Sequence, residues 1–138
     1  MNYLLDTNAC IAVINGKPES VRLRFELAVV EQSFLWIPSI VVFELRYGVA
    51  KSVKKDFNSQ RLGVFLSGPV STLAFTDEDG TAAGEIRADL EGAGTPIGPY
   101  DLLIAGQAKC RGFILVTSNA REFSRIPRLS WEDWGEIG

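Results

Sequence analysis

Short apolar runs alternate with longer segments in which apolar residues recur at helical spacing, and this alternation extends along the whole chain. The uncharged runs at residues 3–5, 34–37, 70–75 and 113–117 have the composition of strands that are buried on both faces. A further extended piece around residues 129–131 is expected at the edge of the sheet. Because strands alternate with helices, the pattern predicts an α/β fold with a mainly parallel sheet that helices cover on both faces.

The segments between these runs carry signals of helix boundaries. Ser39 and Thr76 have the side chains of helix N-caps. Pro99 suits the first turn of a helix, and Gly112 suits the end of one. The helices predicted in this way cover residues 7–12, 19–32, 40–52, 54–66, 76–90 and 99–111.

Length and composition indicate one globular domain over residues 1–138, with 46% hydrophobic and 22% charged residues. The longest apolar region, residues 34–43, is interrupted by Pro38 and is too short to span a bilayer. The first residues lack the pattern of a signal peptide. Cys10 and Cys110 both fall in predicted helices, and we expect them to be small core residues in a reducing cytoplasm. The expected protein is cytoplasmic and has no membrane contact.

The chain contains no histidine, and this excludes several classes of catalytic site. Triads that use histidine, nucleases with histidine ligands and most zinc hydrolase sites all require that residue. Any chemistry must then rest on carboxylates, which select hard cations such as Mg²⁺ or Mn²⁺. The net charge of −3 indicates no broad attraction to nucleic acid, so contacts with it would come from local arginines and lysines or through a cation.

Several acids fall where a parallel sheet gathers its ligands. Asp6 ends the first predicted strand, and Asn119 and Glu122 follow the fourth. Glu44 and Asp101 lie in the first halves of helices that can face the same crevice. Simpler roles remain open, because Asp6 could merely cap a helix, Asp101 could interact with a helix dipole and Glu44 could form a salt bridge. Carboxylates that converge repel one another, so either a cation lies among them or their pKa values rise. A bound cation would favour metal-assisted hydrolysis of a phosphodiester.

Four ordered motifs resemble those of PIN-domain ribonucleases, and most closely those of VapC-type toxins from bacterial toxin–antitoxin pairs. They are Leu4-Leu-Asp-Thr-Asn8, Phe43-Glu-Leu-Arg-Tyr-Gly48, Ile97-Gly-Pro-Tyr-Asp-Leu-Leu-Ile-Ala105 and Val116-Thr-Ser-Asn-Ala-Arg-Glu-Phe123. The resemblance implies an α/β/α sandwich and an endoribonuclease that depends on Mg²⁺ or Mn²⁺. It also implies a homodimer and inhibition by a VapB-type antitoxin. The implied substrate is transfer RNA, with the anticodon region of initiator transfer RNA as the narrower expectation.

Carried over residue by residue, the resemblance assigns catalysis and metal binding to Asp6, Glu44 and Asp101. Many PIN domains have a fourth acid where this chain has Asn119. Asn119 can still offer a carbonyl oxygen, and Glu122 could supply the missing acid. We therefore expect one firmly held ion and leave a second open.

Other polar side chains near these motifs are candidates for supporting roles. Thr7 and Thr117 are expected to cap helices or to hydrogen-bond the acids. Tyr100, next to Asp101, could stack on a base, although a packing role is equally consistent with its position. The arginines that could reach RNA phosphates are Arg46, Arg87 and Arg121.

Two other functions remain possible at the level of sequence. A catalytically weak module that binds RNA or a partner protein is favoured by the asparagine at position 119. A metal-dependent phosphatase on a similar sheet would use the same acids on a small phosphoester. Retained binding without a cleaved product would indicate the first, and turnover of a small phosphoester with RNA left intact would indicate the second.

Overall fold

Five parallel strands form one sheet in the order β3-β2-β1-β4-β5, and helices cover both of its faces. The computed structural model describes residues 1–135. The strands are β1 (Asn2–Leu5), β2 (Phe34–Pro38), β3 (Ser71–Leu73), β4 (Ile114–Val116) and β5 (Trp131–Glu132). The helices are α1 (Thr7–Asn15), α2 (Glu19–Val30), α3 (Ser39–Ala50), α4 (Lys55–Leu66), α5 (Asp77–Gly92), α6 (Pro99–Arg111) and α7 (Ala120–Phe123).

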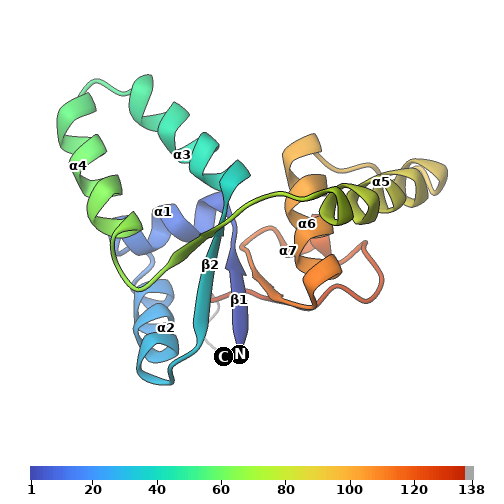
Figure 1. Ribbon diagram of the computed structural model, residues 1–138, viewed down its shortest axis with the longest axis horizontal. Coiled ribbons are helices and arrows are strands. Elements are labelled where there is room, and N and C mark those ends of the chain that lie inside the picture. The colour runs from blue at the N-terminus through green and yellow to red at the C-terminus, as the bar shows by residue number, and fades with distance from the viewer. Residues whose placement is uncertain (136–138) are drawn as a thin grey trace.

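The sheet confirms the predicted parallel α/β sandwich. Figure 1 shows α1 to α4 on one side of β1 and β2 and α5 to α7 on the other. The central strands are short and apolar, and Leu4, Leu5, Ile37 and Leu115 are completely buried between the helical layers. Burial on both faces explains why these strands are continuous apolar runs without polar alternation.

Local signals placed most helix boundaries correctly. Thr76 accepts a hydrogen bond from the Asp79 backbone N–H, and the Asp79 side chain accepts one from the Thr76 N–H, which completes a capping box. Pro99 is the first residue of α6, and Gly112 ends that helix in the left-handed conformation at φ 68°. Ser39 was wrongly expected to be an N-cap. It is the first residue of α3, after Pro38, and its side chain makes no capping bond.

Several other expectations need correction. The third strand covers only Ser71–Leu73 of the predicted 70–75, and the edge strand lies at Trp131–Glu132 instead of 129–131. Cys10 is buried and free, but Cys110 is exposed, so only the first is a core residue. Cys110 lies beside Lys109 on the exposed face of α6, whereas Ala105 and Ala108 lie on the opposite face and are buried in the core. Within residues 1–135 no helix is both long and apolar enough to cross a membrane.

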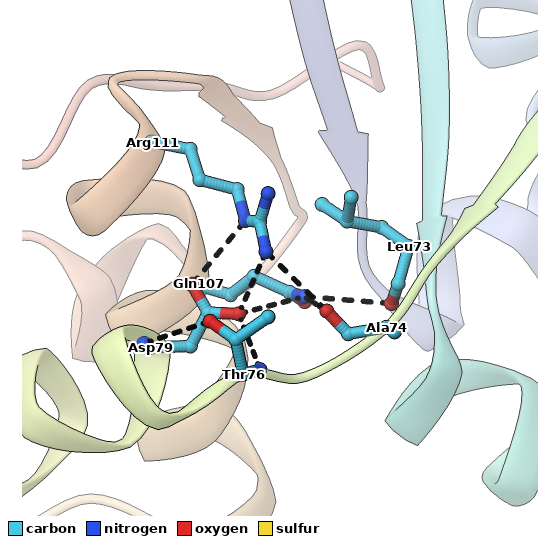
Figure 2. Close-up of polar contacts among 6 residues, drawn as sticks. All are labelled: Leu73, Ala74, Thr76, Asp79, Gln107 and Arg111. Carbon is cyan, nitrogen blue, oxygen red and sulfur yellow. Dashed lines mark hydrogen bonds and ion pairs between the residues drawn. The ribbon is translucent and has the colours of Figure 1, made fainter.

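A buried polar cluster fastens α5 and α6 to the segment that follows β3 (Figure 2). The Arg111 guanidinium donates to both carboxylate oxygens of Asp79, at 3.2 and 3.1 Å. The Gln107 amide donates to the Ala74 carbonyl at 3.0 Å. The Asp79–Arg111 ion pair joins α5 to α6, and the Gln107 amide joins α6 to the segment that follows β3. The cluster therefore fixes α6, whose first turn carries Asp101.

Candidate active site

Asp6 directly follows β1, and the turn that carries Asn119 follows β4, at the point where the strand order reverses. From β1 the chain passes outward to β2 and β3 and then returns on the opposite side to β4, which pairs with β1. The carboxyl ends of β1 and β4 are held together here, because the Asp6 backbone N–H donates to the Val116 carbonyl at 3.1 Å. Such a switch point is where open α/β sheets bind their ligands.

Asp6 is 5% exposed and is held from two sides. Its carboxylate accepts a hydrogen bond of 2.9 Å from the Ala9 backbone N–H, so it caps α1, and it also interacts with Thr117. Burial raises the pKa of Asp6, the bonds from Thr117 and Ala9 oppose that increase, and the charges of Glu44 and Asp133 add to it. The capping role is therefore real, but it accounts for only part of the environment of this acid.

Glu44 reaches the site from α3 and is oriented by α1. The Thr7 hydroxyl donates to the Glu44 carboxylate at 2.7 Å, as expected for a threonine that supports an acid of the site. Within residues 1–135 no basic side chain lies within 4.0 Å of the Glu44 carboxylate, so the simpler salt-bridge role is not the observed one. Glu44 also lines a groove of about 280 Å³ between α1, α3 and α4, together with Ile11, Leu45 and Gly48.

Asp101 enters from the first turn of α6 and is half-buried. The Asn119 amide donates to its carboxylate at 3.4 Å. Burial, followed by the negative charges of Glu122, Asp6 and Glu44, together raises the pKa of Asp101 to about 6. Among these charges, that of Glu122 has the largest effect on the Asp101 pKa. The turn after β4 therefore places both Asn119 and Glu122 beside Asp101.

The charges of Glu122, Asp6 and Glu44 all act on Asp101, and none of these four acids has a cationic partner among residues 1–135. No three acidic or cysteine side chains in that part of the chain stand close enough together to ligate one ion. A Mg²⁺ site needs only one or two direct carboxylates, since water and substrate oxygens complete the octahedron. The buried Asp6 carboxylate, which has no basic partner among residues 1–135, and the nearby Asp101 fit that requirement.

The remaining candidates are distributed over a wider surface. Arg46 and Arg121 are exposed, while Arg87 forms an exposed pair with Glu91 at 2.9 Å on α5. Tyr100 is 46% exposed and packs edge-to-face on Phe43, with ring centroids 5.8 Å apart. This aromatic pair joins the neighbours of Asp101 and Glu44 and connects α6 with α3.

Two residues of the site escaped the sequence analysis. Phe43 forms the aromatic contact with Tyr100, and Asp133 adds a negative charge near Asp6. Asp133 directly follows β5, so a correct placement of that strand would have put its side chain at the carboxyl edge of the sheet.

The parallel sheet and its helical layers define an α/β/α sandwich with carboxylates grouped at its switch point. The PIN domain family matches residues 3–129, and the chain belongs to that family and to its VapC branch. The tRNA(fMet)-specific endonuclease VapC of Salmonella typhimurium (strain LT2) is 47% identical over 137 residues, which are 97% of this chain and 98% of that protein. Ribonuclease VapC2 of Rickettsia felis is 43% identical over 134 residues, again 97% of this chain and 98% of the relative.

Solved structures agree with this assignment. The Rickettsia felis VapBC2 complex, bound to a DNA fragment from its promoter, contains a chain that superposes with a TM-score of 0.90 at 42% identity. The match covers 97% of this chain and 99% of that one. DNA-bound VapBC from Salmonella typhimurium gives a TM-score of 0.88 at 42% identity, over 97% of this chain and 98% of that one.

Proposed function

We propose that the protein is an endoribonuclease that hydrolyses RNA phosphodiester bonds with a divalent metal, using Asp6, Glu44 and Asp101. The observation that carries this proposal is the grouping of carboxylates without a cationic partner at the switch point of a PIN-domain sheet. Acids in this arrangement repel one another, and a bound cation relieves the repulsion.

The chain's own side chains set the positions of the acids. Ala9 and Thr117 fix the Asp6 carboxylate, and Thr7 fixes that of Glu44. The Asn119 amide donates to one oxygen of the Asp101 carboxylate. Supporting bonds of this kind orient metal-binding groups and tune their affinity.

Asp6 and Asp101 would hold a Mg²⁺ or Mn²⁺ ion, with Glu44 beside it and Asn119 or Glu122 as further oxygen donors. Such an ion activates water as a nucleophile and stabilises charge on the phosphate. Because the chain has no histidine, the ribose hydroxyl has no imidazole base to activate it. We therefore expect products with a 5′-phosphate and a 3′-hydroxyl.

Substrate and partner follow from the relatives. The Salmonella relative is a tRNA(fMet)-specific endonuclease, which supports initiator transfer RNA as the substrate. The similar solved chains are in VapBC complexes, which supports a small VapB-type antitoxin as the inhibitor. A homodimer in the cytoplasm completes the proposal.

The test is cleavage of total bacterial RNA by purified protein without antitoxin, followed by mapping of the RNA ends. Parallel reactions contain Mg²⁺, Mn²⁺ or EDTA, and Asp101→Asn serves as the variant. We expect one discrete cut that requires metal and that the variant fails to make.

Intact RNA in every reaction would overturn the proposal. Retained RNA binding would then indicate a binding module, and turnover of a small phosphoester would indicate a phosphatase. Correct folding of Asp101→Asn is checked by its circular dichroism spectrum.

A further inference from the structure

Lysines are concentrated at one place in this acidic chain. Three of its five lysines, Lys51, Lys54 and Lys55, occur within a few residues of one another, and Arg46 precedes them. Residues 46–57, here called the basic arm, contain four bases and one acid. The remainder of the chain has ten bases and sixteen acids, so the arm has the opposite sign to its surroundings.

The basic arm lies on a projecting helical hairpin. It includes the end of α3, the connecting turn and the start of α4, which extend beyond the carboxyl ends of β1 and β2 (Figure 1). All four of its bases are exposed, and within residues 1–135 none of them has a carboxylate within 4.0 Å. Charges that have no internal partner remain available to an external one.

The turn that presents the lysines is held in place. The Ser52 hydroxyl donates to the Val49 carbonyl at 2.7 Å, and the Asn58 amide donates to the Ser52 hydroxyl at 3.1 Å. The backbone N–H of Asn58 donates to the Lys54 carbonyl at 2.9 Å. The lysines therefore extend from a fixed turn, which reduces the entropy that a bound ligand must remove.

Two of the lysines occupy positions that the fold itself does not favour. Lys54 is the N-cap of α4 and makes no capping bond, and Lys55 is the first helical residue. The N-terminus of a helix is the positive end of its dipole, so a cation there is repelled and an anion is attracted. Folding alone therefore does not explain these lysines, whereas binding of a polyanion does.

Exposed aromatic side chains accompany the charges. Tyr47 is 59% exposed and lies under the Lys51 ammonium, which is 4.9 Å from the ring centroid. Phe57 is 56% exposed, at the start of α4. Basic groups combined with exposed rings suit single-stranded nucleic acid, because phosphates pair with the former and bases stack on the latter.

The arm is continuous with the acidic site. Lys51 directly follows α3, the helix that carries Glu44, and the helical rise places their backbones about 10 Å apart. The acids repel RNA phosphates, so a substrate needs a cationic surface close by to hold its backbone. No other segment of the chain has as many lysines within so few residues.

We propose that the basic arm binds the phosphate backbone of the RNA substrate beside the cleavage site, through Lys51, Lys54 and Lys55. This proposal rests on the ribonuclease function proposed above, since it takes the same RNA as the ligand. An acidic protein segment would also neutralise the lysines. RNA accounts better for the exposed rings of Tyr47 and Phe57 and for the continuity with Glu44.

The experiment measures binding while cleavage is blocked. In the Asp101→Asn background, the affinity for a labelled initiator transfer RNA transcript is determined over a series of salt concentrations. The variant of the arm is Lys54→Gln with Lys55→Gln. The matched control is Lys109→Gln with Arg128→Gln, which removes the same charge from two exposed positions outside the arm.

Each phosphate contact contributes about 0.7–0.9 to the slope of log affinity against log salt. We expect the arm variant to lower that slope by about 1.5 and to weaken binding about tenfold at low salt. The control pair should leave both quantities near those of the parent. Replacement of the same two lysines by arginine should restore binding, because it restores the charge.

An unchanged slope in the arm variant, or an equal loss in the control pair, would overturn the proposal. So would a loss of affinity for polyglutamate without a loss for RNA, because that result would assign the arm to an acidic protein. The two proposals fail separately. RNA that binds through the arm but is not cut by protein that retains Asp101 contradicts only the nuclease. RNA that is cut equally well by an arm variant that retains Asp101 contradicts only the arm.

Discussion

Two helical hairpins, α3–α4 and α5–α6, each bring one acid to the site, but they are built in opposite ways. The α5–α6 hairpin buries residues along both helices and contains the Asp79–Arg111 pair. The α4 helix buries only Leu62, and the tip of its hairpin exposes lysines and aromatic rings. Asp101 therefore stands on a rigid support, whereas Glu44 stands at the base of a surface that is open to a ligand. The contrast indicates that positioning and substrate capture are divided between the two hairpins.

Loss of the buried carboxylate should give the largest change. Asp79→Ala leaves Arg111 and Gln107 without their shared partner and removes the capping box of α5. Arg111 reaches the surface, so solvent screens the pair in part, and we expect the free energy of unfolding to fall by about 2–4 kcal/mol. Urea denaturation at pH 7 measures this change. Glu91→Gln, in the exposed pair with Arg87, is the control and should change stability by less than about 0.5 kcal/mol.

The effect of Asp79 should also depend on pH. Burial tends to raise its pKa, but hydrogen bonds from Arg111 and Thr76 and the charge of Arg111 outweigh burial, so the pKa is lowered from 3.8. The folded state therefore holds this proton less tightly than the unfolded chain does. The ionised carboxylate stabilises the fold above pH 3.8, and that contribution is lost as the pH falls through the lowered pKa. A difference between parent and Asp79→Asn that grew on acidification would contradict this sign.

The packing of the two hairpins can be compared at one glycine in each. A methyl group at Gly106 would lie 2.6 Å from Cβ of Ala83 and 2.7 Å from its backbone, so α5 and α6 would have to separate. Gly48 on α3 has open space instead. Gly106→Ala should lower the free energy of unfolding by about 1–3 kcal/mol, and Gly48→Ala should raise it by about 0.5–1 kcal/mol. Thermal unfolding of both variants tests the comparison, and changes of the same sign would refute it.

The acid on the rigid hairpin should destabilise the metal-free protein. Burial and neighbouring acids raise the pKa of Asp101 from 3.8 to about 6, so the folded state favours its protonated form. The stabilisation that the protonated form gives is complete below pH 3.8 and is lost as the pH rises through about 6. In EDTA at pH 7, Asp101→Asn should therefore be more stable than the parent by about 1 kcal/mol after allowance for solvent screening. The gain should vanish at pH 3.5, and a variant that is less stable at pH 7 would contradict the described repulsion.

The sequence predicted the sheet and part of the site, but it did not predict the buried ion pair of the α5–α6 hairpin. Apolar runs and helix signals were sufficient for the parallel sheet, and the ends of its strands led to Asp6 and to the turn that carries Asn119. The burial of Asp79 was not predictable, because a run of acids at a helix start is normally solvated. Its partner Arg111 lies on another helix, 32 residues away.

The basic arm was also missed, because only the net charge of the whole chain was considered. A net charge of −3 describes the protein correctly, but it combines an arm of one sign with a remainder of the other. Local charge density is visible in the sequence. That Lys54 and Lys55 begin a helix without a capping bond and have no acidic partner among residues 1–135 becomes known only from the structure.

The smallest expected effect concerns these two lysines. If binding and not folding explains them, their removal should leave the fold intact or make it slightly more stable. Lys54→Gln with Lys55→Gln removes two cations from the positive end of α4, so we expect a gain of about 0.5 kcal/mol at low salt. The gain should disappear at 1 M salt, where the screening length is about 3 Å. Chemical denaturation by urea at both salt concentrations tests this. A loss of stability would mean that the lysines support the helix, and the arm would then lose the evidence that its charges serve a ligand.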